Sequence, residues 1–84
     1  MAMTKEEALI LMQEELNDLV NYAGIANNYF DRSRAWIIQR LHGNVVNGVR
    51  ATFKPEEYGR LARALRDMAD KFMTAADNIE NGEI

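Results

Sequence analysis

The chain has 84 residues, contains no cysteine and carries a formal net charge of −3. This length accommodates one small domain, and the lack of cysteine excludes a disulfide framework, a thiolate metal site and a cysteine nucleophile. Hydrophobic residues make up 48% and charged residues 27%, with one proline and five glycines. Because this balance excludes a collagen-like or disordered chain, we expect a single globular domain over residues 1–84.

The N-terminal segment, MAMTKEEALILMQEELND, has acidic residues within its apolar stretch. Such a segment is neither a secretory signal peptide nor a membrane span, because both need an uninterrupted apolar run. We therefore expect no membrane association and a location in the cytoplasm.

A first helix is predicted over residues 5–20. Thr4 and Glu7 have the spacing of a capping box, in which each side chain accepts a bond from the other residue's backbone amide. An apolar seam follows at intervals of three and four residues: Leu9, Met12, Leu16, Leu19 and Ala23. Asn21 is a suitable N-cap for a new helix, so the break is placed there. The alternative is one longer helix that continues through Ala26.

A helix–turn–helix is predicted over residues 22–42. The first helix of the pair covers residues 22–30, and Asp31 or Ser33 caps the second helix. Gly43 suits the left-handed position that commonly ends a helix.

The second helix of this pair has two faces. At 100° per residue, Trp36, Ile37 and Leu41 lie on one side. The opposite side carries residues apt for reading DNA, because Arg pairs with guanine, Gln pairs with adenine and Ala permits close approach to the groove. With two residues at the helix start included, the candidates for base contact are Arg32, Ser33, Arg34, Ala35, Gln39 and His42. The candidates for phosphate contact are Arg40, Arg50 and Lys54.

Simpler roles for these residues remain open. Trp36 suits a core position, Gln39 suits solvated surface, and His42 suits the C-terminal end of a helix dipole. The arginines are also suited to weak surface ion pairs with the acidic outer helices.

Positive charge is concentrated in residues 32–54, which hold five basic residues, His42 and no acid. The remaining 61 residues carry 13 acids and five bases, a net charge of −8. A local positive field favours contact with a phosphate backbone even when the whole chain is acidic. Acid-free windows also arise by chance in small proteins, so this alternative stays open.

A small β-hairpin or wing is predicted within residues 43–54. Asn47-Gly48 readily takes the positive φ values of a type I′ turn, and Val45-Val46 and Val49-Arg50 flank it. An ordinary loop is the alternative.

A long helix is predicted over residues 55–81. Pro55 suits the first helical position, and Glu56 and Glu57 suit the positive end of the dipole. Apolar residues recur along this helix every 3.5 positions on average and form a seam: Tyr58, Leu61, Leu65, Met68, Phe72, Ala75 and Ile79. This seam packs either against the first helix of the same chain or against a second copy, and we expect a homodimer.

The residues that catalysis requires are not arranged in any recognisable motif. The sequence has no Ser-His-Asp set and no glycine-rich phosphate loop, and one histidine without cysteine does not make a transition-metal site. We therefore expect a protein that is not an enzyme and binds neither a metal nor a cofactor.

Two resemblances bear on function. IANNYFDRSRAWIIQRLHG, followed by FKPEEYGRLARALRDMADKF, resembles the lambda-repressor-like helix–turn–helix family. By position, that resemblance implies a groove-facing set of Ser33, Arg34, Ala35, Ile38, Gln39 and His42. The chain departs from the family in a turn one residue longer and in Phe30, where a glycine often stands. Residues 20–72 also resemble a family of short bacterial proteins of unassigned function with the core YF..S..W..QRL.G..NG.

The expected architecture is therefore all-α: a four-helix domain with a helix–turn–helix and a hairpin or wing before a long C-terminal helix. The expected function is binding of double-stranded DNA, as a transcriptional regulator or a mobile-element accessory factor, with residues 33–42 in the major groove. The alternative is a helical protein-interaction module that binds no nucleic acid. A purely structural domain is a third interpretation.

Overall fold

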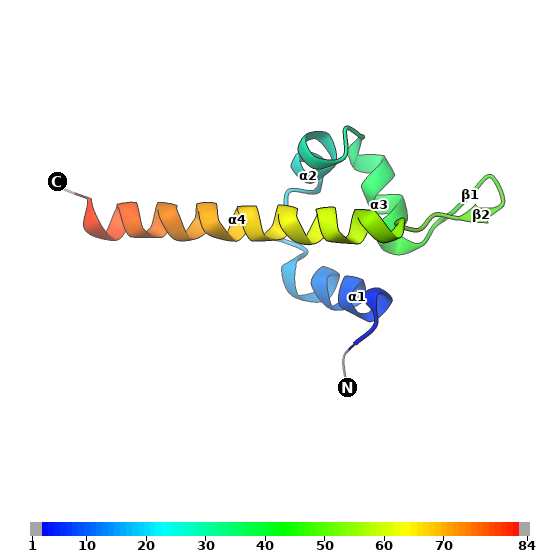
Figure 1. Ribbon diagram of the computed structural model, residues 1–84, viewed down its shortest axis with the longest axis horizontal. Helices are drawn as coiled ribbons and strands as arrows, with labels where there is room; N and C mark the ends of the chain where they lie inside the picture. The colour runs from blue at the N-terminus through cyan, green and yellow to red at the C-terminus, as the bar shows by residue number, and fades with distance from the viewer. Residues whose placement is uncertain (1–2, 83–84) are drawn as a thin grey trace.

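The computed structural model describes residues 3–82, which form an all-α fold with one hairpin (Figure 1). In chain order the elements are α1 (Lys5–Leu16), α2 (Tyr22–Tyr29), α3 (Arg34–His42), β1 (Val45–Val46), β2 (Val49–Arg50) and α4 (Pro55–Asn81). The predicted all-α class and the predicted order of elements are confirmed. The predicted domain also includes residues 1–2 and 83–84, which lie outside the described range.

Helix α1 begins at the predicted capping box. The Thr4 hydroxyl accepts a hydrogen bond from the Glu7 amide at 3.1 Å, and the Glu7 carboxylate accepts one from the Thr4 amide at 3.2 Å. The helix ends at Leu16, so the predicted end at residue 20 is wrong. The amides of Leu19 and Val20 both donate to the Leu16 carbonyl, which closes a turn instead of extending the helix.

Helix α2 begins as a separate helix, which excludes the alternative of one long N-terminal helix. The side-chain oxygen of Asn21 accepts a hydrogen bond from the Gly24 amide at 2.9 Å. Asparagine and aspartate favour turns and caps because their side chains bond to nearby backbone amides. Asn17 and Asp18, immediately before this cap, lie in the turn that separates the two helices.

Four residues, 30–33, connect α2 to α3. The backbone turns at Asp31, whose φ of 54° lies in the left-handed region. Phe30, which stands where a glycine was expected, keeps a φ of −124°. The amides of Phe30 and Arg32 both donate to the Ala26 carbonyl, and the Ser33 hydroxyl then caps α3 by accepting from the Trp36 amide. The left-handed position of this turn is therefore Asp31, since aspartate tolerates it better than a bulky aromatic residue.

The core lies where α2 packs against both α3 and α4. Ala26 of α2, Ile37 of α3 and Ala64 of α4 have no exposed surface. Alanine at a crossing point lets two helix backbones come close together. Met12 of α1 completes this core from the other side of α4, where Leu9 and Leu16 also pack against it.

An aromatic cluster joins the hairpin end of the chain to this core. The Phe30 and Trp36 rings lie 5.1 Å apart, and Phe53 lies 6.2 Å from Phe30 and 6.0 Å from Trp36. The Tyr58 ring lies 5.6 Å from that of Phe53. Each such pair contributes about 0.5–1.5 kcal/mol beyond its buried area. Phe53 lies two residues before α4, so the cluster anchors the segment that leads into the long helix.

One hydrogen bond links the far end of α2 to α4. The Tyr29 hydroxyl donates to the Asp67 carboxylate at 2.7 Å. This bond raises the pKa of Tyr29, because the neutral hydroxyl donates it and the adjacent carboxylate opposes ionisation.

The hairpin has the predicted turn. Asn47 and Gly48 both have positive φ, as a type I′ turn requires, and Val46 pairs with Val49 beside it. The hairpin extends away from the helices (Figure 1). Val45 and Val49 are 72% and 69% exposed, so they contribute little to the core.

Helix α4 extends beyond the rest of the described chain. Its first half packs on α1 and α2, but residues 69–82 are all exposed (Figure 1). We call residues 69–82 the overhang. The predicted bounds of this helix, 55–81, are confirmed. Across the described residues, no helix combines the length and the apolar character needed to cross a membrane.

The left-handed turn at Asp31 gives a stability prediction. Asp31→Val should lower the free energy of unfolding by about 1–2 kcal/mol, because a β-branched side chain opposes positive φ. Asp31→Gly should change it by less than about 0.5 kcal/mol, because easier adoption of positive φ is offset by a more flexible unfolded chain. Urea denaturation followed by the fluorescence of Trp36, the single tryptophan, measures both changes. Equal stability of the two variants would contradict the turn.

Candidate functional site

The polar face of α3 is open in the described chain. Ile37 and Leu41 are buried against the core and set the rotation of the helix. The residues on the other side are exposed or half-buried: Ser33, Arg34, Ala35 and His42 are exposed, and Ile38 and Gln39 are half-buried. All six positions implied by the lambda-repressor-like resemblance are therefore at least partly exposed, and we call this set of residues the α3 face.

Two of the predicted arginines lie elsewhere. The Arg32 and Arg40 guanidinium groups lie 5.7 Å and 4.3 Å from the centre of the Trp36 ring. Arg40 also donates to the Trp36 carbonyl at 3.4 Å. The prediction that grouped Arg32 with Ala35 and Gln39 is therefore wrong. The prediction placed Arg32 by counting 100° per residue, but Arg32 precedes the helix, since α3 begins only at Arg34.

A polar recess of about 320 Å³ borders the α3 face. Arg34, Ile38 and His42, which are four residues apart along α3, line one side of it. The other side is formed by the end of α1 and by the turn after it, with Gln13, Asn17, Val20, Asn21 and Tyr22. Arg34 and His42 are thus brought beside amide side chains that come from a distant part of the sequence.

One hydrogen bond holds the two sides of this recess together. The Gln13 side-chain amide donates to the Leu41 carbonyl at 3.0 Å, across 28 positions of sequence. The same amide donates to the Leu9 carbonyl within α1. Gln13, Asn17 and Asn21 were not predicted from the sequence to be part of a site. Only the capping role of Asn21 was foreseen, because the side on which α1 packs against α3 is decided by the tertiary fold.

Tyr22 lies beneath this recess with its hydroxyl buried. The side chain is 7% exposed, and its oxygen has no hydrogen-bond partner among residues 3–82. Burial raises the pKa of Tyr22, because it disfavours the phenolate.

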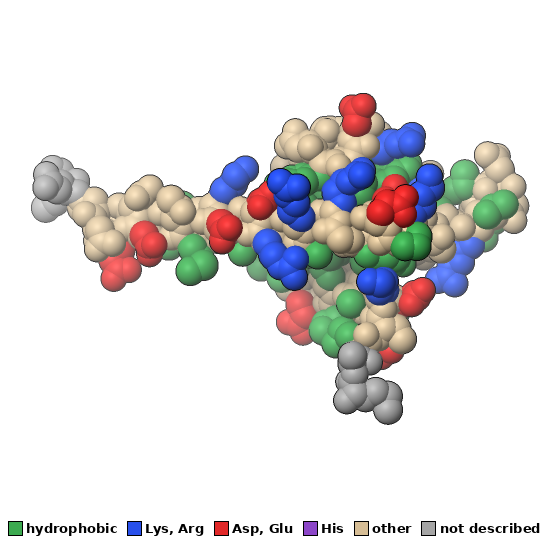
Figure 2. Space-filling model, in the orientation of Figure 1, with side chains coloured by type: hydrophobic (Ala, Val, Ile, Leu, Met, Phe, Trp, Pro, Cys, Tyr) green, Lys and Arg blue, Asp and Glu red, His purple; other side chains and the backbone are tan. Residues whose placement is uncertain are grey.

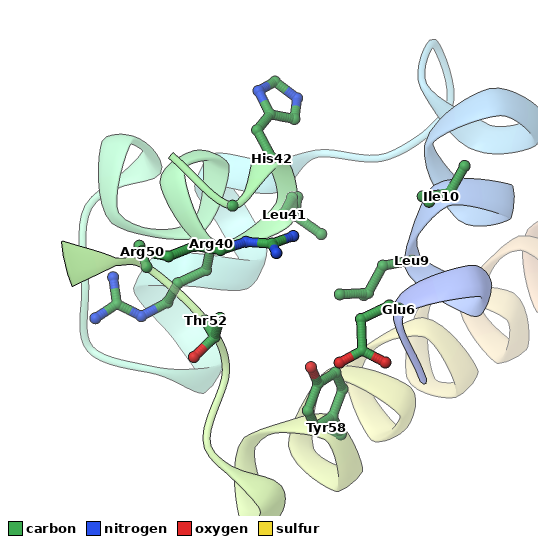
Figure 3. A pocket seen from close by; sticks show the side chains of 11 residues that line it. Glu6, Leu9, Ile10, Arg40, Leu41, His42, Arg50, Thr52 and Tyr58 are labelled. Carbon is green, nitrogen blue, oxygen red and sulfur yellow. The ribbon is translucent and has the colours of Figure 1, made fainter. Parts of the chain in front are cut away.

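A second recess, of about 190 Å³, lies at the base of the hairpin (Figure 3). Arg50 extends into it toward Leu41 and α1, whereas Arg40 points away (Figure 3). The Arg50 side chain passes against Gly43, where a Cβ atom would lie 2.6 Å from its Nε. Gly43 therefore has two reasons to be glycine: this close approach and its φ of 64°.

The three predicted phosphate contacts do not form one cluster. Arg40 lies on Trp36 and Arg50 lies in the recess at the hairpin base. Lys54 is exposed at the start of α4, where its amide donates to the Glu57 carboxylate at 2.7 Å. On the side of the molecule in Figure 2, Lys and Arg gather over the compact part, and acidic side chains dominate the overhang.

Metal-ligating side chains are not clustered in this region. Within residues 3–82, no three His, Cys, Asp or Glu side chains approach closely enough to hold a metal ion. The chemistry that the α3 face and its recess offer is therefore hydrogen bonding and positive charge.

These features define a small all-α protein whose two short packed helices precede a hairpin and a long helix. Residues 10–79 match the family model of a domain of unknown function, DUF5053, and the chain belongs to this family. The match begins within α1 and reaches nearly to the end of α4. No curated protein and no solved structure matches the chain. The resemblance to a family of unassigned function is thus confirmed at this level, and the lambda-repressor-like resemblance stays a prediction.

The buried hydroxyl of Tyr22 gives a prediction about this site. Tyr22→Phe should leave the free energy of unfolding unchanged or raise it by up to about 1 kcal/mol, because the hydroxyl is desolvated without gaining a bond. Tyr29→Phe is the matched control, which removes a hydroxyl that donates to Asp67. Urea denaturation compares the two. A Tyr22→Phe variant destabilised more than Tyr29→Phe would show that the Tyr22 hydroxyl has a bound partner.

Proposed function

We propose that the protein binds double-stranded DNA, with the α3 face in the major groove and α2 holding α3 in place. The observation that carries this proposal is the open polar surface of α3 opposite its two buried anchors, Ile37 and Leu41. A helix used only for packing needs no such set of exposed arginine, histidine and small residues.

The geometry of the helix pair supports this proposal. Helix α3 has 9 residues, a length of roughly 13 Å, and the diameter of an α-helix with its side chains, about 10–12 Å, suits a major groove about 12 Å wide. Ala35 is exposed and small, so the helix axis can approach the base edges closely. Ala26 is fully buried where α2 crosses α3, in keeping with the small residue of lambda-repressor-like helix pairs. Membership in that wider class is part of this proposal.

The surroundings of α3 supply groups suited to phosphate contact. His42 shares the polar recess with Asn17 and Asn21, and amide side chains are common donors to phosphate oxygens. Arg32 and Arg40 sit on Trp36 at the flank of the helix, where the DNA backbone would run. We propose Arg34 and Gln39 for base contact, and we move Arg32 to the phosphate contacts. A role as a transcriptional regulator or a mobile-element accessory factor in the cytoplasm belongs to the same proposal.

A protein-interaction module is the second candidate, and the hairpin favours it. A wing that contacts DNA benefits from cations at its tip. Here the tip is Asn47-Gly48, and Val45 and Val49 are largely exposed. Exposed valines are better suited to an apolar protein surface. In this case the arginines would meet an acidic partner.

Fluorescence polarisation against random and genomic duplexes tests the first candidate. We expect micromolar or tighter binding at low salt that weakens steeply as salt rises, because each phosphate contact displaces a counterion. Arg34→Ala should weaken binding by about 1–3 kcal/mol on a preferred duplex, and Gln39→Ala should do so without changing the salt slope. Arg66→Ala, on the exposed outer side of α4, is the matched control.

Two outcomes would contradict DNA binding. One is affinity no tighter than millimolar at low salt, and the other is binding without salt dependence. Equal losses for Arg34→Ala and Arg66→Ala would indicate attraction by overall charge, with no defined surface on α3.

A further inference from the structure

The overhang of α4 is a helix without support in the described chain. Residues 69–82 are all exposed, and they include Phe72 and Ile79 at 61% and 83%. A free helix of about 13 residues is marginal in water even with favourable residues. The overhang therefore needs a surface that covers its apolar side.

The apolar side of the overhang continues the buried side of the same helix. At 100° per residue, Met68, Phe72, Ala75 and Ile79 fall within about 40° of Leu61, which is buried in the core. We call these four residues the overhang seam; Met68, which also packs against the core, is the last residue before the overhang. Asp70 and Asp77 lie on the opposite side of α4 by the same rotation. Figure 2 shows a hydrophobic group on the edge of the overhang on the α1 side, with acidic side chains beside it.

We propose that a second copy of this chain covers the overhang seam, and that the two α4 helices run antiparallel. Placing Met68 opposite the partner's Ile79 also places Phe72 opposite the partner's Ala75, because both pairs share a centre between residues 73 and 74. A large side chain then faces a small one, which keeps the two helix axes evenly spaced. In a parallel pair, Phe72 would face the partner's Phe72 and Ala75 would face Ala75.

Charge complementarity favours the antiparallel direction. Residues 58–66 of α4 carry three arginines and no acid, whereas residues 67–82 carry four acids and one lysine. In the antiparallel pair Arg66 is the arginine that overlaps the partner's acidic segment, where it lies level with position 81, beside Glu80. In a parallel pair Arg66 would face the partner's Arg66 instead.

The position of α1 and α2 also opposes a parallel pair. The overhang seam lies on the same side of α4 that α1 and α2 cover in the first half of that helix. A parallel partner on that side would bring its own compact part against them. The antiparallel partner instead ends beside an apolar recess lined by Leu11, Leu16 and Leu65, and the partner's Ile79 comes to rest near it.

Spin-label distances test the direction of the pair. The chain has no cysteine, and a Cβ at Gly59 meets open space, so Gly59→Cys carries a label with little disturbance. Gly59 lies about 14 residues from the proposed centre, so the two labels should be roughly 43 Å apart at 1.5 Å per residue. A parallel pair would give roughly 25 Å or less, from adjacent axes and the reach of the labels.

Variants of the seam test which surface is used. Phe72→Asp should weaken the dimer by at least about a hundredfold in sedimentation equilibrium, because each dimer loses two buried phenylalanines. Thr74→Asp adds the same charge on a side away from the seam and should leave the dimer nearly unchanged. Unaltered Trp36 fluorescence in both variants would show that the core is folded, since Trp36 is remote from the overhang.

A wild-type chain that is monomeric at high micromolar concentration would overturn the proposal. A distance near 25 Å, or equal losses for Phe72→Asp and Thr74→Asp, would overturn it as well. None of these measurements involves nucleic acid, so the dimer can fail while DNA binding holds, and the reverse is also true.

Discussion

The position of α2 between α3 and α4 is the constraint on which the rest of the structure depends. Helix α2 contacts both neighbours, and Ala26 and Ala64 at these contacts are fully buried. Any larger side chain at either position would force two backbones apart, because protein interiors have no spare volume of that size. With α2 held in this way, the short turn through Asp31 fixes the direction in which α3 runs. Ile37 and Leu41 of α3 then face the core.

The aromatic cluster then divides the surface of α3. Trp36 lies against Phe30 and Phe53, so the cations around it are used in stacking: Arg32 and Arg40 over Trp36 and Arg60 over Phe30. Each stacked cation contributes about 0.5–1 kcal/mol at an exposed site. The remaining polar residues, from Ser33 to His42, lie apart from this cluster. These residues take no part in the stacking, and for this reason the DNA proposal centres on them and leaves Arg32 and Arg40 for phosphate contact.

The two proposed interactions use opposite ends of the molecule. The α3 face belongs to the compact part, where α1, α2 and α3 meet, whereas the overhang extends away from it (Figure 1). An antiparallel pair of overhangs would leave both α3 faces uncovered, one at each end. Symmetric DNA-binding proteins present two copies of one helix in this general manner. The second copy would thus add a second α3 face and would not obstruct the first.

Local residue patterns determined most of the secondary structure. The Thr4–Glu7 box, the Asn47-Gly48 turn and Pro55 each act through bonds or backbone angles within a few positions, so their effects can be read in order along the chain. The apolar seam of α4 was also predicted from the sequence, because the spacing of 3.5 residues between its apolar positions can be counted directly along the chain. The end of α1 was missed because the apolar spacing continues through Leu19, while the backbone closes a turn at Leu16.

The tertiary structure decided which polar groups come together. Gln13, Asn17 and Asn21 border Arg34 and His42 because the tertiary fold brings the end of α1 to α3, where the Gln13 amide bonds to the Leu41 carbonyl 28 positions away. The contact between Arg32 and Trp36 depends on the turn before α3. The rotation of 100° per residue applies only within the helix, so it does not predict this contact. The sequence by itself determined the helices, the hairpin and the two-sided character of α3. Packing decided which parts of that polar surface stay open and that no other described residue covers the overhang, since both depend on contacts between residues far apart in sequence.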